Sequence, residues 1–251
     1  MALNMSGNTI LITGGATGIG LELAEQLAAK GNEVIICGRR EARLKAAQER
    51  IAGLHIRVCD VASQAEREDL YKWATTNFPK LNVLVNNAGI QRDFDFLNPS
   101  EPWEVTRQEI VINVEAPIHL ATLFAEHFKS VPDSSIINVS SGLAFMPMSL
   151  FPIYCGTKAA LHSISMTMRH QLGKAGIRVI EVIPPAVDSE LNQEGRIKRG
   201  MTSTGTTAEE FVSAVMAGLE RGDDEIGYGT SERGRRASRD EIDEGFKRMN
   251  R

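Results

Sequence analysis

Short apolar runs alternate along the chain with longer segments whose apolar positions recur at helical spacing. The runs are rich in Val, Ile and Leu, which is typical of parallel strands buried on both faces. They occupy residues 9–13, 33–37, 54–59, 81–85, 135–140 and 178–183, and a short final strand is predicted at 225–228. This alternation predicts an α/β fold, a Rossmann-type doubly wound parallel sheet with helices on both faces, as a single domain over residues 1–251.

The intervening segments predict helices, each with a recognisable start or end. They cover residues 21–30, 41–52, 63–78, 103–128 and 153–174, followed by one helix from Thr207 and a last one from Ser238. Three helices begin with Ser or Thr and carry Glu three residues later, a capping box: Ser63/Glu66, Thr207/Glu210 and Ser238/Glu241. Pro117 is expected to bend the segment 103–128, because proline has no amide hydrogen to donate.

Three glycines follow the first predicted strand within the stretch Thr-Gly-Gly-Ala-Thr-Gly-Ile-Gly. Gly14, Gly18 and Gly20 allow a sharp turn that brings backbone N–H groups against an anion at a helix N-terminus. Strand, glycine turn and helix together form the first half of a dinucleotide-binding unit. Glycine turns at this place also serve close packing alone, so the interpretation depends on residues further along the chain.

Composition narrows the classes of function. The chain has 251 residues, 42% of them hydrophobic, and a formal charge of -4, which gives no overall attraction to nucleic acid or to an anionic membrane. The N-terminus has no signal-peptide pattern, and no apolar run approaches the roughly 20 residues that span a bilayer. Cys37, Cys59 and Cys155 are isolated from one another, which favours a reducing compartment. We therefore expect a cytoplasmic protein that binds neither nucleic acid nor membrane.

Two segments do not follow the alternation. The polar stretch 188–206 shows little periodicity and is predicted to be a substrate lid, because long irregular loops in compact domains are commonly functional. The C-terminal segment 229–251 is highly charged, and its run of arginines from Arg233 to Arg239 is predicted to be solvated and mobile.

Four polar residues are candidates for proton transfer. Tyr154 and Lys158 are four residues apart in a predicted helix, so both side chains project from one face. An ammonium beside the phenol, together with a cationic nicotinamide ring, would lower the pKa of Tyr154 and make it a general acid or base. Ser141, at the end of a strand, would hold the substrate oxygen, and Asn113 would position a water behind Lys158. Each residue alone also has an ordinary structural explanation.

The combination of these residues resembles the short-chain dehydrogenase/reductase family. The resemblance covers about residues 8–189 and is carried by 13–20, 86–89, Asn113, Ser141 and the segment 154–158. It implies oxidation of an alcohol or reduction of a carbonyl with NAD(P), hydride passing to or from nicotinamide C4. It also implies a catalytic tetrad of Asn113, Ser141, Tyr154 and Lys158.

The chain length resembles the single-domain branch of the family, and residues 82–93 and 140–147 are similar to its DltE-type oxidoreductases. The family commonly pairs the helices that hold the Asn and the Tyr of the tetrad, which implies a homodimer or homotetramer. The C-terminal segment 229–251 diverges from the glycine-rich ending common in the family, and is expected to pack differently between subunits.

The resemblance also assigns the cofactor contacts. They are Gly14, Thr17, Gly18, Ile19, Gly20, Arg39, Asp60, Val61, Asn87, Ala88, Gly89, Tyr154, Lys158, Pro184, Val187 and Ser189. NADP is expected in preference to NAD, because Gly38 and Arg39 after the second strand offer a cation for the 2′-phosphate and no carboxylate for the ribose hydroxyl. Pro185 and Ser189 depart from the Pro-Gly and Thr of the family, and Pro185 alters the expected placement of the nicotinamide.

The substrate is expected to be a small or medium, largely apolar alcohol or carbonyl compound. Apolar residues between the serine and the tyrosine of the tetrad predict an apolar pocket: Leu143, Phe145, Met146, Met148 and Phe151. Gln91 and Arg92 are placed at its rim, where Arg92 could bind a carboxylate, although a solvated loop arginine is the simpler interpretation. The five histidines show no metal-ligand spacing, so no metal is expected: His55, His119, His127, His162 and His170.

Two other functions remain open from the sequence. One is a non-catalytic NADP(H)-binding redox sensor that acts through a protein partner; such relatives typically lose the tyrosine or the lysine, and both are present here. The other is a hydrolase that uses Ser141, but this serine is not in a Gly-x-Ser-x-Gly sequence and a hydrolase needs no glycine turn at residues 14–20.

Overall fold

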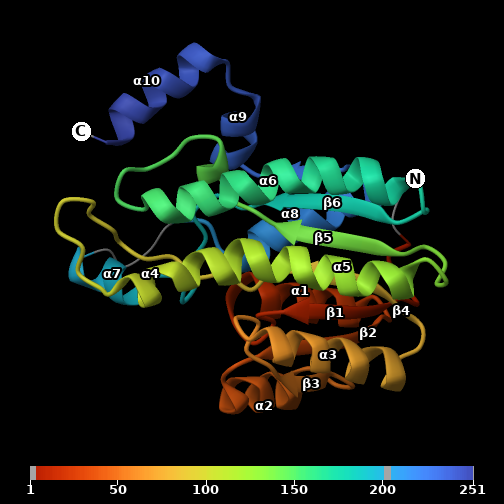
Figure 1. The fold of residues 1–251 in the computed structure, drawn as a ribbon. Helices are drawn as coiled ribbons and strands as arrows, with labels where there is room; N and C mark the ends of the chain where they lie inside the picture. The colour runs from red at the N-terminus through yellow and green to blue at the C-terminus, as the bar shows by residue number, and fades with distance from the viewer. Residues whose placement is uncertain (1–3, 201–204, 251) are drawn as a thin grey trace.

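A parallel sheet of seven strands organises the computed structural model, which describes residues 4–200 and 205–250 (Figure 1). The strand order is β3-β2-β1-β4-β5-β6-β7, and every neighbouring pair is parallel. The strands are β1 (Thr9–Thr13), β2 (Glu33–Gly38), β3 (His55–Val58), β4 (Leu81–Asn86), β5 (Ser135–Val139), β6 (Arg178–Ile183) and β7 (Glu225–Gly227). The expected doubly wound α/β fold is confirmed, including the short final strand.

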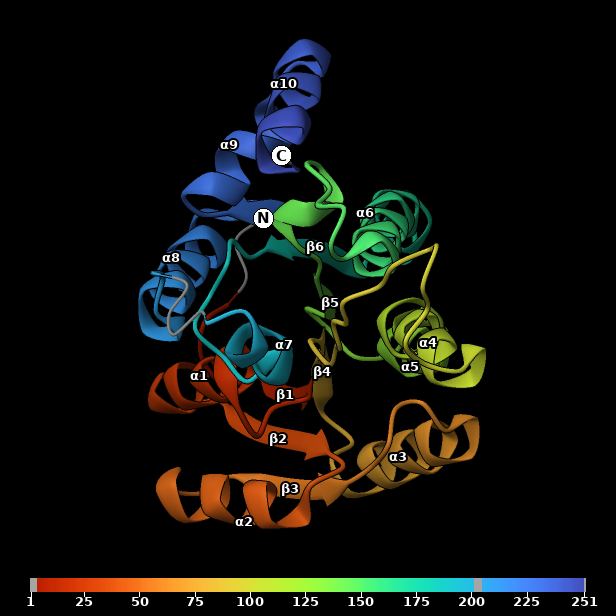
Figure 2. The same cartoon turned by 90° about the vertical axis from the view of Figure 1, so that its left-hand side faces the viewer.

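Helices cover both faces of this sheet (Figure 2). On one face lie α1 (Gly18–Ala29), α2 (Glu41–Arg50) and α8 (Ala208–Arg221). On the other lie α3 (Gln64–Asn77), α5 (Ala116–Phe128) and α6 (Pro152–Gly173). The strands β1, β4 and β5 are buried at every position, which explains their near-continuous apolar runs.

The remaining helical elements are shorter. They are α4 (Trp103–Ile110), the π-helical turn η1 (Val111–Glu115), the 3-10 turn η2 (Gly142–Ala144), α7 (Gln193–Lys198), α9 (Thr230–Arg236) and α10 (Arg239–Met249). Figures 1 and 2 show α9 and α10 extending beyond the β7 edge of the sheet. Within the described residues, no helix is both long enough and apolar enough to span a bilayer.

The predicted helix over residues 103–128 is interrupted before Pro117 rather than bent at it. Pro117 has no N–H to donate to the carbonyl of Asn113, four residues earlier, so the regular ladder cannot continue through this point. Instead, the N–H of Ala116 donates to the carbonyl of Val111, five residues earlier, which is the π-helical pattern. The irregularity therefore places the fully buried Asn113 in a widened turn.

The capping boxes at Thr207 and Ser238 are confirmed, and the one at Ser63 forms only in part. Ser63 accepts from the N–H of Glu66, but the Glu66 carboxylate accepts from the N–H of Asp60 at 2.7 Å instead. The Glu66 carboxylate therefore binds the N–H of Asp60 rather than that of Ser63, and this bond joins the loop after β3 to α3.

The arginine run from Arg233 to Arg239 is exposed at Arg233, Arg236 and Arg239, as expected for a solvated segment, but not at Arg235. Its first four residues lie in α9, where the half-buried Arg235 pairs with Glu225 and Glu232. Arg239 pairs with Asp243 one turn further along α10. Arg235 and Arg239 thus form ion pairs with carboxylates three or four residues away on their helices, and Arg235 also pairs with Glu225 of β7. The pair with Glu225 depends on the fold and cannot be recognised from the sequence.

Candidate functional site

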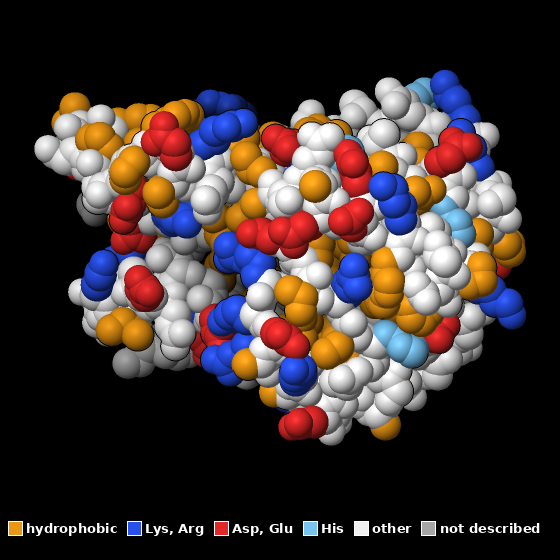
Figure 3. Space-filling view, turned by 60° about the horizontal axis from the view of Figure 1, so that its bottom comes forward, with side chains coloured by type: hydrophobic (Ala, Val, Ile, Leu, Met, Phe, Trp, Pro, Cys, Tyr) orange, Lys and Arg blue, Asp and Glu red, His pale blue; other side chains and the backbone are white. Residues whose placement is uncertain are grey.

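A cleft of about 610 Å³ opens at the carboxyl ends of the strands, where β1 and β4 lead the chain to opposite sides of the sheet. Ligands of doubly wound sheets bind at this switch point. Figure 3 shows that this side of the molecule is hollowed, with Lys and Arg side chains gathered along the edge of the hollow. Every residue expected to contact a cofactor lines the cleft, from Gly14 in the glycine turn to Ser189 after β6.

The glycine turn has no room for side chains. Gly14 and Gly18 have φ angles of +64° and +55°, which side-chain-bearing residues rarely adopt. A Cβ on Gly14 would lie 2.9 Å from the Cα of Ala88, and one on Gly20 would lie 2.5 Å from the carbonyl oxygen of Gly14. The glycine turn therefore packs directly on the loop after β4. On its other side no side chain of these glycines lies between the backbone of the turn and the cleft.

Two side chains fasten this turn to β4. Asn87 donates from Nδ2 to the carbonyls of Thr13 and Gly14, at 2.9 and 3.1 Å. In the other direction, the hydroxyl of Thr13 accepts from the N–H groups of Asn87 and Ala88, both at 3.1 Å. Sequence analysis placed Asn87 in the cofactor site but missed Thr13, whose polarity within an apolar strand is the signal that could have identified it.

The far end of the cleft is basic, and its charges are partly paired. Arg39 lies 3.9 Å from Asp60 and is more than half exposed. Arg40 and Arg43 both pair with Glu190, at 2.6 and 2.8 Å. Arg39 is therefore the more available cation at the end of β2.

The proposed tetrad converges around Gly89. A Cβ on Gly89 would lie 3.3 Å from Oδ1 of Asn113 and 3.5 Å from Nζ of Lys158. Nζ of Lys158 donates to the carbonyl of Val139 at 2.8 Å and lies 5.6 Å from the ring centre of Tyr154. Ser141, Tyr154 and Lys158 line the cleft, whereas Asn113 lies buried behind it.

The side chain of Asn113 has protein partners on both its amide atoms. Oδ1 accepts from the N–H of Ile90 at 2.9 Å, and Nδ2 donates to the carbonyl of Ile90 and to Oγ1 of Thr157, at 2.9 and 3.1 Å. The amide thus joins the loop after β4, η1 and α6. The side chain is thus fully engaged with the protein, and the main-chain carbonyl of Asn113 lacks the usual helical donor because Pro117 has no N–H.

Burial dominates the electrostatics of the tyrosine and the lysine. It raises the pKa of Tyr154 above its usual value, against a hydrogen bond from Ser141 that lowers it. It lowers the pKa of Lys158 to about 8, against Glu181 and Glu109, which raise it. The phenolate expected beside an ammonium and a cationic ring is therefore not favoured by the protein alone, where Tyr154 holds its proton at neutral pH.

The predicted apolar substrate pocket is wrong in its residues, since none of the five lines the cleft. Phe145 packs on the ring of His162, with centroids 4.5 Å apart, and Phe151 lies beneath the guanidinium of Arg199. Met146 packs against Gly245 of α10, and Leu143 and Met148 join a cluster with Tyr154 and Cys155. Helix α10 covers Met146 and helix α6 covers Phe145, both of which were predicted to line the pocket.

The rim residues Gln91 and Arg92 do line the cleft, and Arg92 is half-buried rather than solvated. Its N–H donates to Oε1 of Glu109 at 3.1 Å. Glu109 is a buried carboxyl of α4, and sequence analysis missed it. The available signal was a carboxylate one turn before Asn113 in a helix that packs against the sheet.

The predicted lid contains a helix that its weak periodicity did not indicate, α7. Residues 189–194 line the cleft, and residues 201–204 of the predicted lid lie outside the described residues. Asn192 donates to Asp93 at 2.8 Å, and Arg199 pairs with the same carboxylate. Figure 2 shows α7 in front of the carboxyl ends of the strands, so this segment forms one wall of the cleft.

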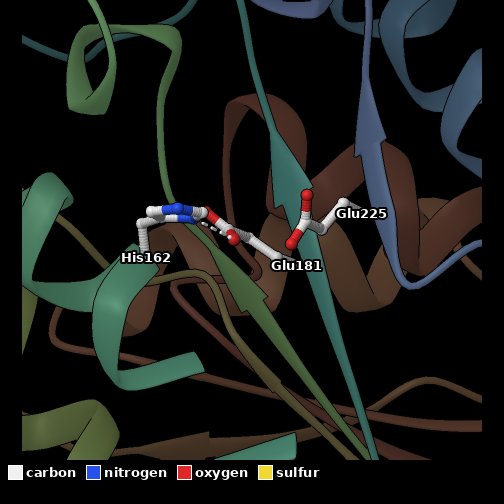
Figure 4. A group of neighbouring side chains, drawn as sticks. All are labelled: His162, Glu181 and Glu225. Atoms are coloured by element: carbon white, nitrogen blue, oxygen red, sulfur yellow. Dashed lines mark hydrogen bonds and ion pairs between the residues drawn. The ribbon is translucent and has the colours of Figure 1, made fainter. Parts of the chain in front are cut away.

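A second group of titratable side chains lies outside the cleft. Figure 4 shows the carboxylate of Glu181 directed toward the ring of His162, with Glu225 on the other side of Glu181, and one ligand atom of each residue lies within 4.8 Å of the others. Nδ1 of His162 and Oε2 of Glu181 are 2.7 Å apart, which raises the pKa of His162. Because Arg169 and Arg235 already pair with Glu225, we interpret this cluster as an ion-pair network. Linear spacing of the histidines could not reveal it.

The arrangement fits a dinucleotide. The bare glycine backbone at the start of α1 suits a pyrophosphate, since helix N–H groups point toward the cleft there. Arg39 offers a cation to a further phosphate, and Asp60 and Val61 line the cleft beside it. Fold and cleft together define a dinucleotide-binding protein of the Rossmann type.

Comparison with known proteins identifies the family. Residues 8–200 match the sequence model of the short chain dehydrogenases, and this chain belongs to that family of oxidoreductases. It is 50% identical over 248 residues to the uncharacterized oxidoreductase DltE of Bacillus subtilis, with 99% of this chain and 98% of that protein covered.

Two further relatives extend the comparison. The L-xylulose reductase of Caenorhabditis elegans is 33% identical over 192 residues, with 74% of each chain covered. The crystal structure of a short chain dehydrogenase from Burkholderia cenocepacia in complex with NADP superposes with a TM-score of 0.81 at 27% identity, covering 97% of this chain and 98% of that one.

The closeness of the glycine turn leads to a prediction with an internal control. Gly20→Ala is expected to destabilise the protein by about 1–3 kcal/mol and to weaken NADPH binding, because its Cβ would meet Asn87 and the carbonyl of Gly14. The same substitution at Gly173, also in a helix, meets open space and is expected to be neutral or stabilising by about 0.5–1 kcal/mol. Thermal melting and fluorescence titration measure both effects; equal behaviour of the two variants would contradict the closed turn.

Proposed function

We propose that this chain is an NADP(H)-dependent oxidoreductase that interconverts an alcohol and a carbonyl compound, with Tyr154 as general acid and base. The observation that supports this most strongly is the convergence of Ser141, Tyr154 and Lys158 on the same cleft as the glycine turn. The NADP complex of the B. cenocepacia relative and the carbonyl reduction named for the C. elegans relative agree with it.

In this proposal each side chain has a separate task. The bound nicotinamide supplies or accepts the hydride. Tyr154, protonated at neutral pH, donates its proton to the carbonyl oxygen during reduction. Oγ of Ser141 accepts from the N–H of Leu143 at 3.1 Å and hydrogen-bonds to Tyr154, so its hydroxyl hydrogen can turn to a substrate oxygen that binds beside Tyr154.

Lys158 and Asn113 supply the proton path behind the tyrosine. Near neutral pH Lys158 is mostly protonated, since its pKa of about 8 lies above the pH. Its ammonium stabilises the phenolate that is left after proton donation. Asn113 acts as a positioning residue, because its side chain holds the loop after β4 against α6.

Replacing Tyr154 by Phe tests the catalytic assignment. The variant is expected to lose turnover of carbonyl substrates by about 10²- to 10⁴-fold, because the proton donor is removed, with NADPH affinity changed less than about threefold. Tyr228→Phe, outside the cleft, serves as the matched control. Turnover is followed by the absorbance of NADPH, and full activity of the Tyr154 variant would refute the mechanism.

Cofactor choice is tested at Arg39. Arg39→Asp is expected to weaken NADPH binding by about 10- to 100-fold, the worth of a charge-assisted hydrogen bond, while leaving NADH binding nearly unchanged. Arg107→Asp makes the same charge change on the exposed surface of α4 and is expected to leave the ratio of the two affinities alone. An unchanged ratio in the Arg39 variant would mean that Arg39 does not bind the 2′-phosphate.

A further inference from the structure

Arg92 differs from the other arginines that line the cleft. Arg39 and Arg40 each have a carboxylate partner, Asp60 and Glu190. The guanidinium of Arg92 makes no hydrogen bond and no ion pair with any residue in the described part of the chain, and its Nη1 is enclosed without a partner. Arg92 also lines the cleft, and buried donors of a charged group are costly when unpaired, so the part of Arg92 that borders the cleft favours a ligand oxygen that accepts from it.

The position of Arg92 is fixed through its backbone. Its N–H donates to Oε1 of Glu109, a carboxyl that is 1% exposed, and the second oxygen of this carboxyl is enclosed without a partner. Glu109 lies one turn before Asn113 on the helical segment that supports the tetrad. Because the carboxylate binds the backbone of Arg92, the guanidinium is left for the cleft.

Arg92 lies on the side of the tetrad that faces the segment 188–200. It follows Gly89, which adjoins Asn113 and Lys158, by three residues. The next residue, Asp93, binds Asn192 and Arg199 of that segment. Arg92 thus belongs to the loop that leads from Gly89 to the contacts of Asp93 with α7, and it lines the same cleft as Tyr154 and Lys158.

We propose that Arg92 selects carbonyl substrates that carry a second oxygen acceptor next to the reacting carbonyl. A planar guanidinium donates two parallel hydrogen bonds to such a group, whether it is the carboxylate of a 2-oxo acid or the second carbonyl of a vicinal diketone. A simple ketone leaves these donors unpaired and is disfavoured. This inference rests on the proposed function and names the substrate class of the same site.

Glu109 separates the two forms of substrate by pH. Burial raises the pKa of Glu109 to about 7, against Arg92 and Lys158, which lower it; Tyr154 and Cys155 of α6 also face this carboxyl. Above pH 7 Glu109 is therefore mostly ionised and repels a bound carboxylate, whereas a neutral diketone is unaffected. Lys158 also loses its proton near pH 8, so the native protein is compared with Glu109→Gln. A KM that rises above pH 7 in the native protein but not in Glu109→Gln identifies the 2-oxo acid, and the same pH dependence of KM in both identifies the diketone.

The test compares three substrates of equal chain length: 2-pentanone, 2,3-pentanedione and 2-oxopentanoate. The full-length protein is expected to prefer at least one of the last two, and Arg92→Met is expected to lower kcat/KM for that substrate by about 10²-fold, with 2-pentanone changed less than about threefold. Arg92→Lys keeps the charge without the planar fork and is expected to lie between. Arg107→Met removes an exposed charge from α4 and serves as the control.

Each outcome decides one of the two claims. Equal losses for all three substrates in Arg92→Met, or a preference that survives this substitution at an unchanged melting temperature, would overturn the role of Arg92. Turnover of 2-pentanone with no preference for the other two would do the same and leave the proposed function intact. NADPH binding without turnover of any carbonyl compound would instead overturn the proposed function.

Discussion

The hydrogen bonds between Asn87 and the end of β1 are the constraint on which the site depends. They join the glycine turn to the loop after β4 from both sides, through the carbonyls of Thr13 and Gly14 and the hydroxyl of Thr13. This closeness leaves no space for a Cβ at Gly14 or Gly20. The phosphate-binding backbone and the loop that leads to Gly89 and Arg92 are thereby fixed relative to one another, so that a bound dinucleotide and the reacting side chains share one frame.

A second constraint is the burial of charge beside this frame. Tyr154 and Lys158 are both nearly inaccessible, and burial opposes the ionised form of each. Two buried carboxyls, Glu109 and Glu181, raise the pKa of Lys158 and so favour its protonated form. Tyr154 thus keeps its proton in this site, and the mechanism that we propose requires further positive charge from the ligand before a phenolate is favoured.

The sequence was sufficient to predict the fold and to select residues that gather in one cleft, from Gly14 to Ser189. Apolar runs such as Leu81–Val85 indicate strands that are buried on both faces, and glycines indicate positions where a Cβ cannot fit. Both signals are local, so they can be recognised in the sequence without knowledge of the fold. The substrate side was predicted poorly because it depends on packing between distant segments. Met146 is covered by α10, Glu109 meets Arg92 only through the fold, and Glu181 meets His162 across a strand and a helix. No spacing along the chain encodes those contacts.

The central claim is that this cleft transfers hydride between a nicotinamide and a substrate carbon under control of Tyr154. It is tested most directly by following deuterium from NADPH labelled at C4 into the products of a mixed panel of carbonyl compounds, by mass spectrometry. The account predicts that the label appears on the new carbinol carbon with the native protein and is lost with Tyr154→Phe. NADPH that binds tightly while no product carries deuterium would contradict it.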